Sequence, residues 1–203
     1  MTSTDVKPEN VDPDSARIKR AIINAAGILF EEKGLYQTSV GEVADLAGVT
    51  VTEAYQYVRR KSEIILMIME DFTNCVNERI MPEIEKLDDP TAKLLKAQDI
   101  FFTIMDEFAV QTLLLYRESK ALDRDGQIKI MSEEMEHVRI FEDILKDGVQ
   151  KGVFKPHDTN LMASNIIIFG HEWVLKGWRL KGRFSLEEYI AAQSKIILDT
   201  ILP

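Results

Sequence analysis

The sequence carries the same helix-starting pattern twice in close succession. In Ser39-Val40-Gly41-Glu42, and again in Thr50-Val51-Thr52-Glu53, a hydroxyl residue is followed three positions later by a glutamate. This is the capping-box pattern, in which both side chains satisfy free backbone N–H groups at the start of a helix. Gly48 lies between the boxes and allows the backbone of a tight turn. Two short helices joined so closely must cross steeply, which predicts a helix-turn-helix unit.

Apolar residues at helical spacing extend this prediction on both sides of the unit. They recur every three or four positions over residues 15–33, and again over residues 63–80, where Met81-Pro82 ends the pattern. The two capped helices are expected over residues 39–47 and 50–57. We therefore expect three helices to form the helix-turn-helix domain and a fourth helix to link it to the rest of the chain.

The remaining sequence has helical rather than strand-like periodicity. Apolar stripes over residues 93–118 and 126–151 are followed by Leu161–Trp178, a segment that is apolar almost all round. A third capping box, Ser185–Glu188, begins a last helix. We predict an all-α fold of about nine helices. Its expected parts are a disordered tail over residues 1–14, a helix-turn-helix DNA-binding domain over 15–62, and a ligand-binding and dimerisation domain over 63–203.

Charge is unevenly distributed along the chain. The net charge is −9 over 203 residues, yet residues 15–61 hold seven basic and five acidic side chains, against 17 and 25 over residues 62–203. An acidic protein with a locally basic segment is suited to bind nucleic acid through that segment. No apolar run approaches the length of a membrane span, and the first ten residues lack the apolar part of a signal peptide. We therefore expect a cytoplasmic protein without membrane contacts.

The second capped helix has the dimensions and the surface of a DNA-recognition helix. Its length of about 12 Å matches the width of the DNA major groove. Polar side chains on it can donate to phosphates or base edges, and glutamine is the natural partner of adenine. The candidate DNA contacts are Thr38 and Ser39, where free N–H groups favour phosphate, and Thr50, Thr52, Tyr55, Gln56, Tyr57 and Lys61. Ordinary helical bundles share these features, so the spacing alone leaves that alternative open.

A longer run of residues resembles the N-terminal domain of the TetR family of transcriptional regulators. The resemblance covers about residues 15–70 and rests on the run Ile22-x2-Ala25-Ala26-x2-Leu29-Phe30-x3-Gly34-x3-Thr38-Ser39-x3-Val43-Ala44-x2-Ala47-Gly48-Val49-x5-Tyr55-x-Tyr57-x3-Lys61. It implies an all-helical homodimer whose first three helices bind operator DNA and whose C-terminal helices form an effector pocket and the dimer interface. The family's DNA-contacting pattern falls on Thr38, Ser39, Thr50, Thr52, Tyr55, Tyr57 and Lys61.

Two positions depart from the family pattern. Thr52-Glu53 stands where many members have Gly-Thr or Pro-Thr, and Val58 stands where phenylalanine commonly follows the second tyrosine. Glu53 either completes the capping box with Thr50, the role that we favour, or accepts a hydrogen bond from the N4 amine of a cytosine.

The acidic C-terminal part is expected to hold an effector. Aromatic and methionine side chains could surround an apolar ligand there, although such stripes are more often helical core. The candidate pocket residues are Phe101, Met105, Phe108, Tyr116, Met131, Met135, Phe141, Phe169 and Trp173. The segment from His171 to Tyr189 is weakly similar to family members that respond to fatty-acyl or related CoA thioesters. Candidate polar anchors are Arg117, Arg139 and His171, each more simply explained as a salt-bridged or capped surface group.

Metal and enzyme alternatives find little support. Glu134 and His137 have the Glu-x-x-His spacing of a di-iron bundle, but such a site needs this pattern twice and the second copy is missing. Because glutamates stand at positions 133, 134 and 136, His137 is expected on a solvated acidic face. No phosphate loop or nucleophile motif occurs, so no catalytic residue, metal or cofactor is predicted.

The sequence therefore predicts a ligand-responsive transcriptional regulator. We expect a homodimeric repressor that leaves a palindromic operator in double-stranded DNA when a small apolar or acyl-CoA-like effector binds. The dimer is expected from Leu161–Trp178 and the last helix, whose apolar faces exceed what one subunit covers. The alternative is a helical interaction module, or a degenerate di-iron-type bundle, without DNA binding.

Overall fold

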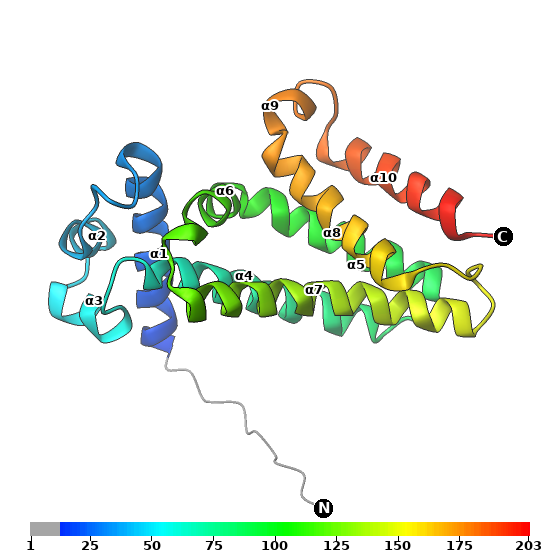
Figure 1. Cartoon of the computed structure of the whole chain (residues 1–203), viewed down its shortest axis with the longest axis horizontal. Coiled ribbons are helices and arrows are strands. Elements are labelled where there is room, and N and C mark those ends of the chain that lie inside the picture. The colour runs from blue at the N-terminus through cyan, green and yellow to red at the C-terminus, as the bar shows by residue number, and fades with distance from the viewer. Residues whose placement is uncertain (1–12) are drawn as a thin grey trace, which may run out of the picture. The chain divides into compact units, whose positions relative to one another are not determined.

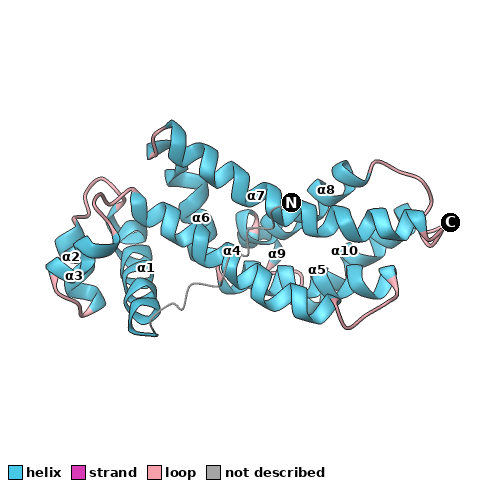
Figure 2. Ribbon diagram, turned by 90° about the horizontal axis from the view of Figure 1, so that it is seen from below, coloured by secondary structure: helices cyan, strands magenta, loops and turns pink. Residues whose placement is uncertain are grey.

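A computed structural model describes residues 13–203 of the chain, and every regular element in this range is a helix. Figure 2 shows the helices joined by loops, without a strand among the described residues. The all-α prediction is confirmed, with ten α-helices in the described range. They are α1 (Pro13–Lys33), α2 (Val40–Ala47), α3 (Val51–Tyr57), α4 (Glu63–Ile84), α5 (Pro90–Glu107), α6 (Ala109–Glu118), α7 (Arg124–Gln150), α8 (Thr159–Leu175), α9 (Gly177–Leu180) and α10 (Leu186–Ile201), with the 3₁₀ helix η1 (Ser119–Ala121) between α6 and α7. Within residues 13–203, none of the helices combines the length and the apolar character needed to cross a membrane.

The chain divides into two compact units, and the division falls inside α4, between Met67 and Ile68. The first unit contains α1, α2 and α3, and the second contains most of α4 and all later helices. The predicted domain limits stay predictions. Residues 1–12 of the predicted tail lie outside the described residues, whereas Pro13 and Asp14 belong to the first turn of α1.

A small core between α1, α2 and α3 holds the first unit together. Phe30 near the end of α1 is fully buried, and Leu35 just beyond it is nearly so. Val43 and Ala44 of α2 and Ala54 of α3 are also fully buried. Helices as short as α2 and α3 are marginal by themselves, so their stability comes from this packing and from their caps.

The turn between α2 and α3 forms as the sequence predicts. Gly48 ends α2 with a φ of 69°, a left-handed conformation that glycine adopts without strain, and its N–H bonds to the carbonyls of Ala44 and Asp45. Ser39 and Thr50 are the N-caps of α2 and α3, and both capping boxes are complete. The helix-turn-helix unit is therefore built from the predicted residues.

The core of the second unit lies between α4, α5, α7, α8 and α10. Figure 1 shows α5 and α8 beside α7, with α10 packed on α5. The ring of Phe101 in α5 lies edge-on to Phe72 of α4 and to Phe141 of α7, with ring centroids 6.2 and 5.7 Å apart. Edge-to-face contacts of this kind stabilise beyond the burial of the rings, and they fix how the three helices meet.

Two predicted helix limits are wrong. α4 does not end at Met81-Pro82 but continues to Ile84, which is buried in the core. Pro82 itself is exposed, so its ring and its missing N–H disturb only the solvent side of the last turn. The segment predicted as one helix over Leu161–Trp178 is α8 followed by the single turn of α9, because the backbone of Lys176 (φ −114°, ψ 20°) leaves the helical conformation.

Gly148 of α7 packs directly against the ring of Phe154, and this close approach provides a test of the core. A Cβ at position 148 would lie 2.1 Å from Phe154 Cδ2. We expect Gly148→Ala to lower the free energy of unfolding by about 1–3 kcal/mol, because overpacking outweighs the better helix propensity of alanine. Urea denaturation measures the change. Gly182→Ala is the control, since no atom lies within 4 Å of its added Cβ, and equal stability of the two variants would contradict the described packing.

Candidate DNA-binding surface and effector pocket

Ionised carboxylates cap the starts of α2 and α3. Glu42 Oε2 accepts the N–H of Ser39 at 2.8 Å, and Glu53 Oε2 accepts both the N–H and the hydroxyl of Thr50 at 2.7 Å. The hydrogen bond from Lys33, together with those from Ser39, lowers the pKa of Glu42 to about 2. The bonds from Thr50 likewise lower the pKa of Glu53. In this structure Glu53 therefore has the capping role that the sequence favours.

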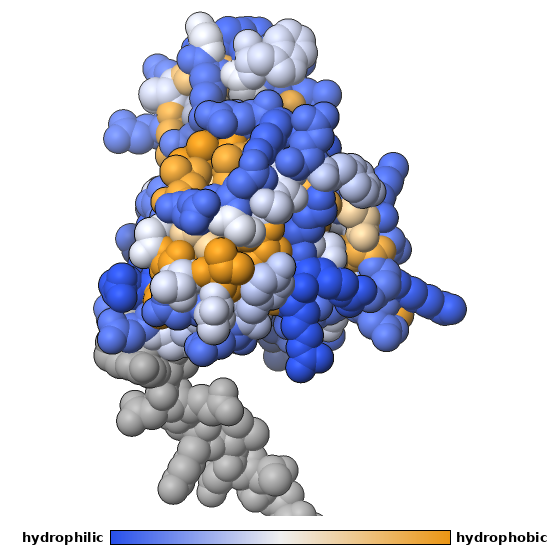
Figure 3. Space-filling model, turned by 90° about the vertical axis from the view of Figure 1, so that its left-hand side faces the viewer, coloured by the Kyte–Doolittle hydropathy of each residue, from blue (hydrophilic) through white to orange (hydrophobic). Residues whose placement is uncertain are grey.

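The outer face of α3 presents polar side chains that the caps do not use. Thr52, Tyr55 and Gln56 are exposed, with 52% of Tyr55 accessible, and Tyr57 is half-buried. Thr50 is also exposed, but its hydroxyl is bonded within the capping box. Figure 3, which faces the side where α2 and α3 lie in Figure 1, shows mostly hydrophilic residues with separate apolar clusters between them. Thr52, Tyr55 and Gln56 are thus the polar side chains that α3 offers to a partner.

Thr38 and Lys61 are directed inward instead. Thr38 is 2% exposed, and its hydroxyl donates to the Gly34 carbonyl at 2.9 Å. Lys61 Nζ donates to the carbonyls of Tyr36 at 2.6 Å and Thr38 at 3.1 Å. Lys61 therefore ties the segment after α3 to the loop between α1 and α2.

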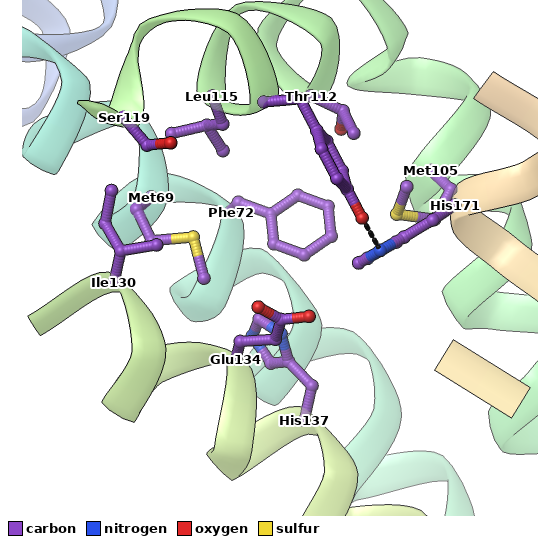
Figure 4. A pocket seen from close by; sticks show the side chains of 11 residues that line it. Met69, Phe72, Met105, Thr112, Leu115, Ser119, Ile130, Glu134, His137 and His171 are labelled. Carbon is purple, nitrogen blue, oxygen red and sulfur yellow. Dashed lines mark hydrogen bonds between the residues drawn. The ribbon is translucent and has the colours of Figure 1, made fainter. Parts of the chain in front are cut away.

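The second unit contains a partly open cavity of about 230 Å³ between α4, α5, α6, α7 and α8, called the central cavity below. Its lining residues are Met69, Phe72, Met105, Thr112, Leu115, Tyr116, Ser119, Ile130, Glu134, His137 and His171. Figure 4 shows Leu115 and Ser119 on one wall, Glu134 and His137 on the opposite wall, and Phe72 between them. Mostly apolar walls with a few converging polar groups are typical of a ligand pocket.

Two histidines line the central cavity in their neutral form. His171 is 8% exposed, and its Nδ1 lies 2.6 Å from the Tyr116 hydroxyl. His137 is 1% exposed, and its Nε2 lies 3.1 Å from the Thr73 hydroxyl. Burial lowers the pKa of each ring to about 4, with a smaller contribution to His137 from His171. The prediction that His137 lies on a solvated acidic face is wrong, because the ring turns inward and packs edge-on against Phe72.

Glu134 is the acidic side chain of the central cavity. Its carboxylate points toward Phe72 in Figure 4, and burial raises its pKa. Ile130, Glu134 and His137 lie three or four residues apart and therefore share one face of α7 with the fully buried Phe141. The spacing of these four residues in the sequence places them on one face of α7, but it does not show that this face turns inward, and the sequence therefore did not predict this wall.

Two of the nine predicted pocket residues, Met105 and Tyr116, line the central cavity. The other seven do not: Phe101, Phe141 and Trp173 are buried in the core, Phe108 and Phe169 pack against it, and Met131 and Met135 are exposed. Met131 and Met135 lie one helical turn apart, on a different face of α7 from Glu134 and His137. Their hydrophobic character alone did not indicate which face of α7 turns inward.

Of the three candidate polar anchors, His171 lines the central cavity and the two arginines do not. Arg117 pairs with Glu118. Arg139 borders a second, more open hollow of about 380 Å³ between α4, α5 and α7, whose rim is made largely of charged side chains. We regard the central cavity as the candidate effector site, because its polar groups are buried among apolar walls.

Comparison with known families identifies the class of protein. Residues 22–68 match "Bacterial regulatory proteins, tetR family", and residues 87–201 match "Tetracyclin repressor-like, C-terminal domain". The chain belongs to the TetR family of transcriptional regulators. It is therefore a DNA-binding regulator of transcription and not an enzyme, and the expected family membership is confirmed.

Individual relatives support this assignment over most of the chain. The chain is 30% identical over 198 residues to the HTH-type transcriptional regulator HbdR of Aromatoleum sp. (strain CIB), covering 97% of this chain and 86% of HbdR. It is 24% identical over 162 residues to the HTH-type transcriptional repressor KstR2 of Mycolicibacterium smegmatis, covering 79% of this chain and 78% of KstR2. A crystal structure of AibR with isovaleryl coenzyme A and operator DNA matches with a TM-score of 0.71 at 18% identity, covering 88% of this chain and 97% of AibR. At that identity, the structural match shows the fold alone.

Because His137 and His171 are buried as neutral rings, we expect the second unit to lose stability when the pH is lowered. An unfolded histidine has a pKa near 6.5, so between about pH 6.5 and 4 the unfolded chain binds protons that folded His137 and His171 do not. The free energy of unfolding therefore falls as the pH is lowered through this range, by roughly 1–2 kcal/mol per histidine between pH 7 and 5. Glu134 offsets part of the loss, because its raised pKa favours proton uptake by the folded chain.

Urea unfolding at pH 7 and pH 5 measures this loss. We expect His137→Gln to lose less stability than the unsubstituted chain, because glutamine cannot titrate but can still bond to the Thr73 hydroxyl. His157→Gln is the control, since His157 does not line the central cavity. An unchanged pH dependence in the His137 variant would contradict its burial as a neutral ring.

Proposed function

We propose that this regulator is a homodimeric repressor that releases a palindromic operator when a small apolar or acyl-CoA-like effector enters the central cavity. The observation that carries the proposal is that α4 belongs to both units of the chain. Met69 and Phe72 of α4 line the cavity, and its first residues, up to Met67, belong to the unit that contains α3. A ligand in the cavity therefore acts on the helix that continues into the DNA-binding unit.

The size of the response depends on how differently the effector binds the two conformations of the regulator. Reversing an equilibrium from 1:99 to 99:1 needs a difference of about 5.5 kcal/mol in binding free energy. The hydrogen bond between Tyr116 and His171 joins α6 to α8. A ligand that breaks or strengthens this bond changes how the two helices are held together, and so favours one conformation of the regulator over the other. Equal affinity for both conformations would leave operator binding unchanged.

The proposed operator contacts centre on α3. We assign Thr52, Tyr55 and Gln56 to contacts with bases and phosphates, because these side chains are exposed and neither capping box uses them. An ammonium group has three donors, and Lys61 uses two of them on carbonyls, which leaves one for a phosphate. The full proposed set is Thr38, Ser39, Thr50, Thr52, Tyr55, Gln56, Tyr57 and Lys61, in which Thr38 and Ser39 stand at the start of α2, where the free N–H groups of the first turn favour a phosphate.

The proposed dimer uses α8 and α10. Leu161 and Ile168 lie on one face of α8 with 59% and 53% of their surface exposed, and Ile196 of α10 is 53% exposed. Apolar side chains of this size gathered on two helices are typical of a subunit interface. To occupy successive major grooves of a palindromic site, such a dimer has to present its two copies of α3 about 34–36 Å apart.

The relatives support a coenzyme A thioester as the effector class. AibR, which shares the fold, has a crystal structure with isovaleryl coenzyme A and operator DNA. The apolar walls of the central cavity suit a short acyl chain or a ring, whereas about 230 Å³ is too small for a complete coenzyme A group. We therefore place the acyl part inside the cavity and the nucleotide part outside it.

Substitution of Gln56 tests the DNA-binding surface. Operator fragments are selected from genomic DNA of the source organism, and their affinity is measured by fluorescence anisotropy at fixed salt. We expect Gln56→Ala to weaken binding about 5- to 150-fold and to relax the preference at one base pair, because a bidentate contact to adenine is lost. The control Gln150→Ala removes an exposed glutamine at the end of α7. Equal affinity of the two variants would contradict the proposed contact.

The same anisotropy measurement tests the effector class. Failure of isovaleryl coenzyme A and longer acyl thioesters to release the operator would contradict the proposed effector class.

Substitution of Ile168 tests the dimer. We expect Ile168→Glu to shift sedimentation from dimer to monomer and to weaken operator binding steeply, because it places two charges in an apolar interface. Ile128→Glu is a matched control, because Ile128 lies on α7 and is also 53% exposed. A monomeric unsubstituted protein, or a dimer unaffected by Ile168→Glu, would contradict this interface.

A further inference from the structure

Glu134 differs from the other ionisable groups of the central cavity, because its carboxylate has no hydrogen bond or ion pair within the described residues. The rings of His137 and His171 are bonded to Thr73 and Tyr116. None of the 11 lining residues is a lysine or an arginine. A partly buried carboxylate without a donor is unfavourable, so a ligand that supplies a donor gains affinity at this point.

The charges around Glu134 restrict the chemistry of that donor. His137 and His171 are neutral near pH 7, because burial lowers the pKa of each to about 4. A ligand carboxylate beside Glu134 would meet a like charge with no cation in the lining to offset it. A hydroxyl group supplies a hydrogen-bond donor without bringing a second charge into an apolar space. The lining therefore disfavours an anion, and because the acyl part of the effector proposed above brings no cation into the cavity, the donor that remains is a neutral one.

We propose that the part of the effector that enters the central cavity carries a hydroxyl group, which donates a hydrogen bond to the Glu134 carboxylate. In Figure 4 the carboxylate faces the ring of Phe72, with Met69 and Ile130 to one side and Leu115 across the space. An apolar skeleton packs between these side chains while its hydroxyl group points to α7. The ligand class is a short aliphatic or aromatic hydroxy compound, free or as the acyl part of a thioester. This inference rests on the effector role proposed above for the cavity.

Three small probes separate the possible chemistries. 4-Methylphenol has a hydroxyl donor, its methyl ether has a similar shape without the donor, and benzylamine has a cationic donor. Binding is followed by the ¹³C methyl resonances of methionine in the full chain. Met69 and Met105 line the central cavity and report on it, whereas Met81 and Met162 do not line it and serve as internal controls.

We expect 4-methylphenol to shift the Met69 and Met105 resonances and to bind about 10- to 100-fold more tightly than its methyl ether, the range for a hydrogen bond to a charged acceptor. In Glu134→Leu this preference should disappear while the ether keeps its affinity, because the apolar walls remain. Glu134→Gln should give an intermediate preference, since an uncharged amide still accepts a hydrogen bond. Glu136→Leu, which changes an exposed glutamate of the same helix, should behave like the unsubstituted chain.

Several outcomes overturn the inference. Equal binding of the phenol and its ether, a preference that survives in Glu134→Leu, or no binding of either probe would each remove the proposed hydrogen bond. Tighter binding of benzylamine than of 4-methylphenol would make Glu134 the counter-ion of a cationic ligand instead. Because no DNA is present, the hydroxyl preference is tested separately from operator release, and either can fail without the other.

Discussion

The placement of α3 depends on charged side chains that bond to the backbone. Glu42 and Glu53 satisfy N–H groups at the starts of α2 and α3, and Lys61 satisfies carbonyls in the loop before α2. Hydrogen bonds to ionised groups are stronger than those between neutral groups, so the two glutamates fix where α2 and α3 begin and Lys61 fixes the segment after α3 against the loop. A helix of seven residues such as α3 has little stability of its own. The direction in which its side chains point therefore follows from these bonds and from the small core beneath them.

The second unit combines a closed aromatic core with a partly open cavity beside it, whose mostly apolar walls carry a few polar groups. At the core, Gly170 of α8 lies so close to Phe101 that a Cβ would come within 2.7 Å of the ring. Next to this tight packing, burial makes the charged forms of His137, His171 and Glu134 less favourable than they are in water. Groups with perturbed pKa values in a pocket are typical of functional sites.

The extent to which the sequence predicts the structure differs between the two units. The capping boxes and Gly48 are predictable because their chemistry involves residues within a few positions of one another. The wall of the central cavity is not, because Met69, Thr112 and Glu134 come from helices far apart in the sequence. Whether His137 meets solvent or Phe72 depends on how α7 packs against α4, which local spacing does not specify. The family could be identified from the sequence because its signature residues, like those of the turn, lie within one continuous segment of the chain.

Three outward-facing residues of α3 take no part in holding the helix in place. Ser39, Glu42, Thr50 and Glu53 form the caps, while Thr52, Tyr55 and Gln56 take no part in them. Replacement of an outward side chain therefore leaves the helix start intact. Such a division allows target preference to diverge between duplicated copies of a gene by single substitutions, without a compensating change elsewhere in the domain.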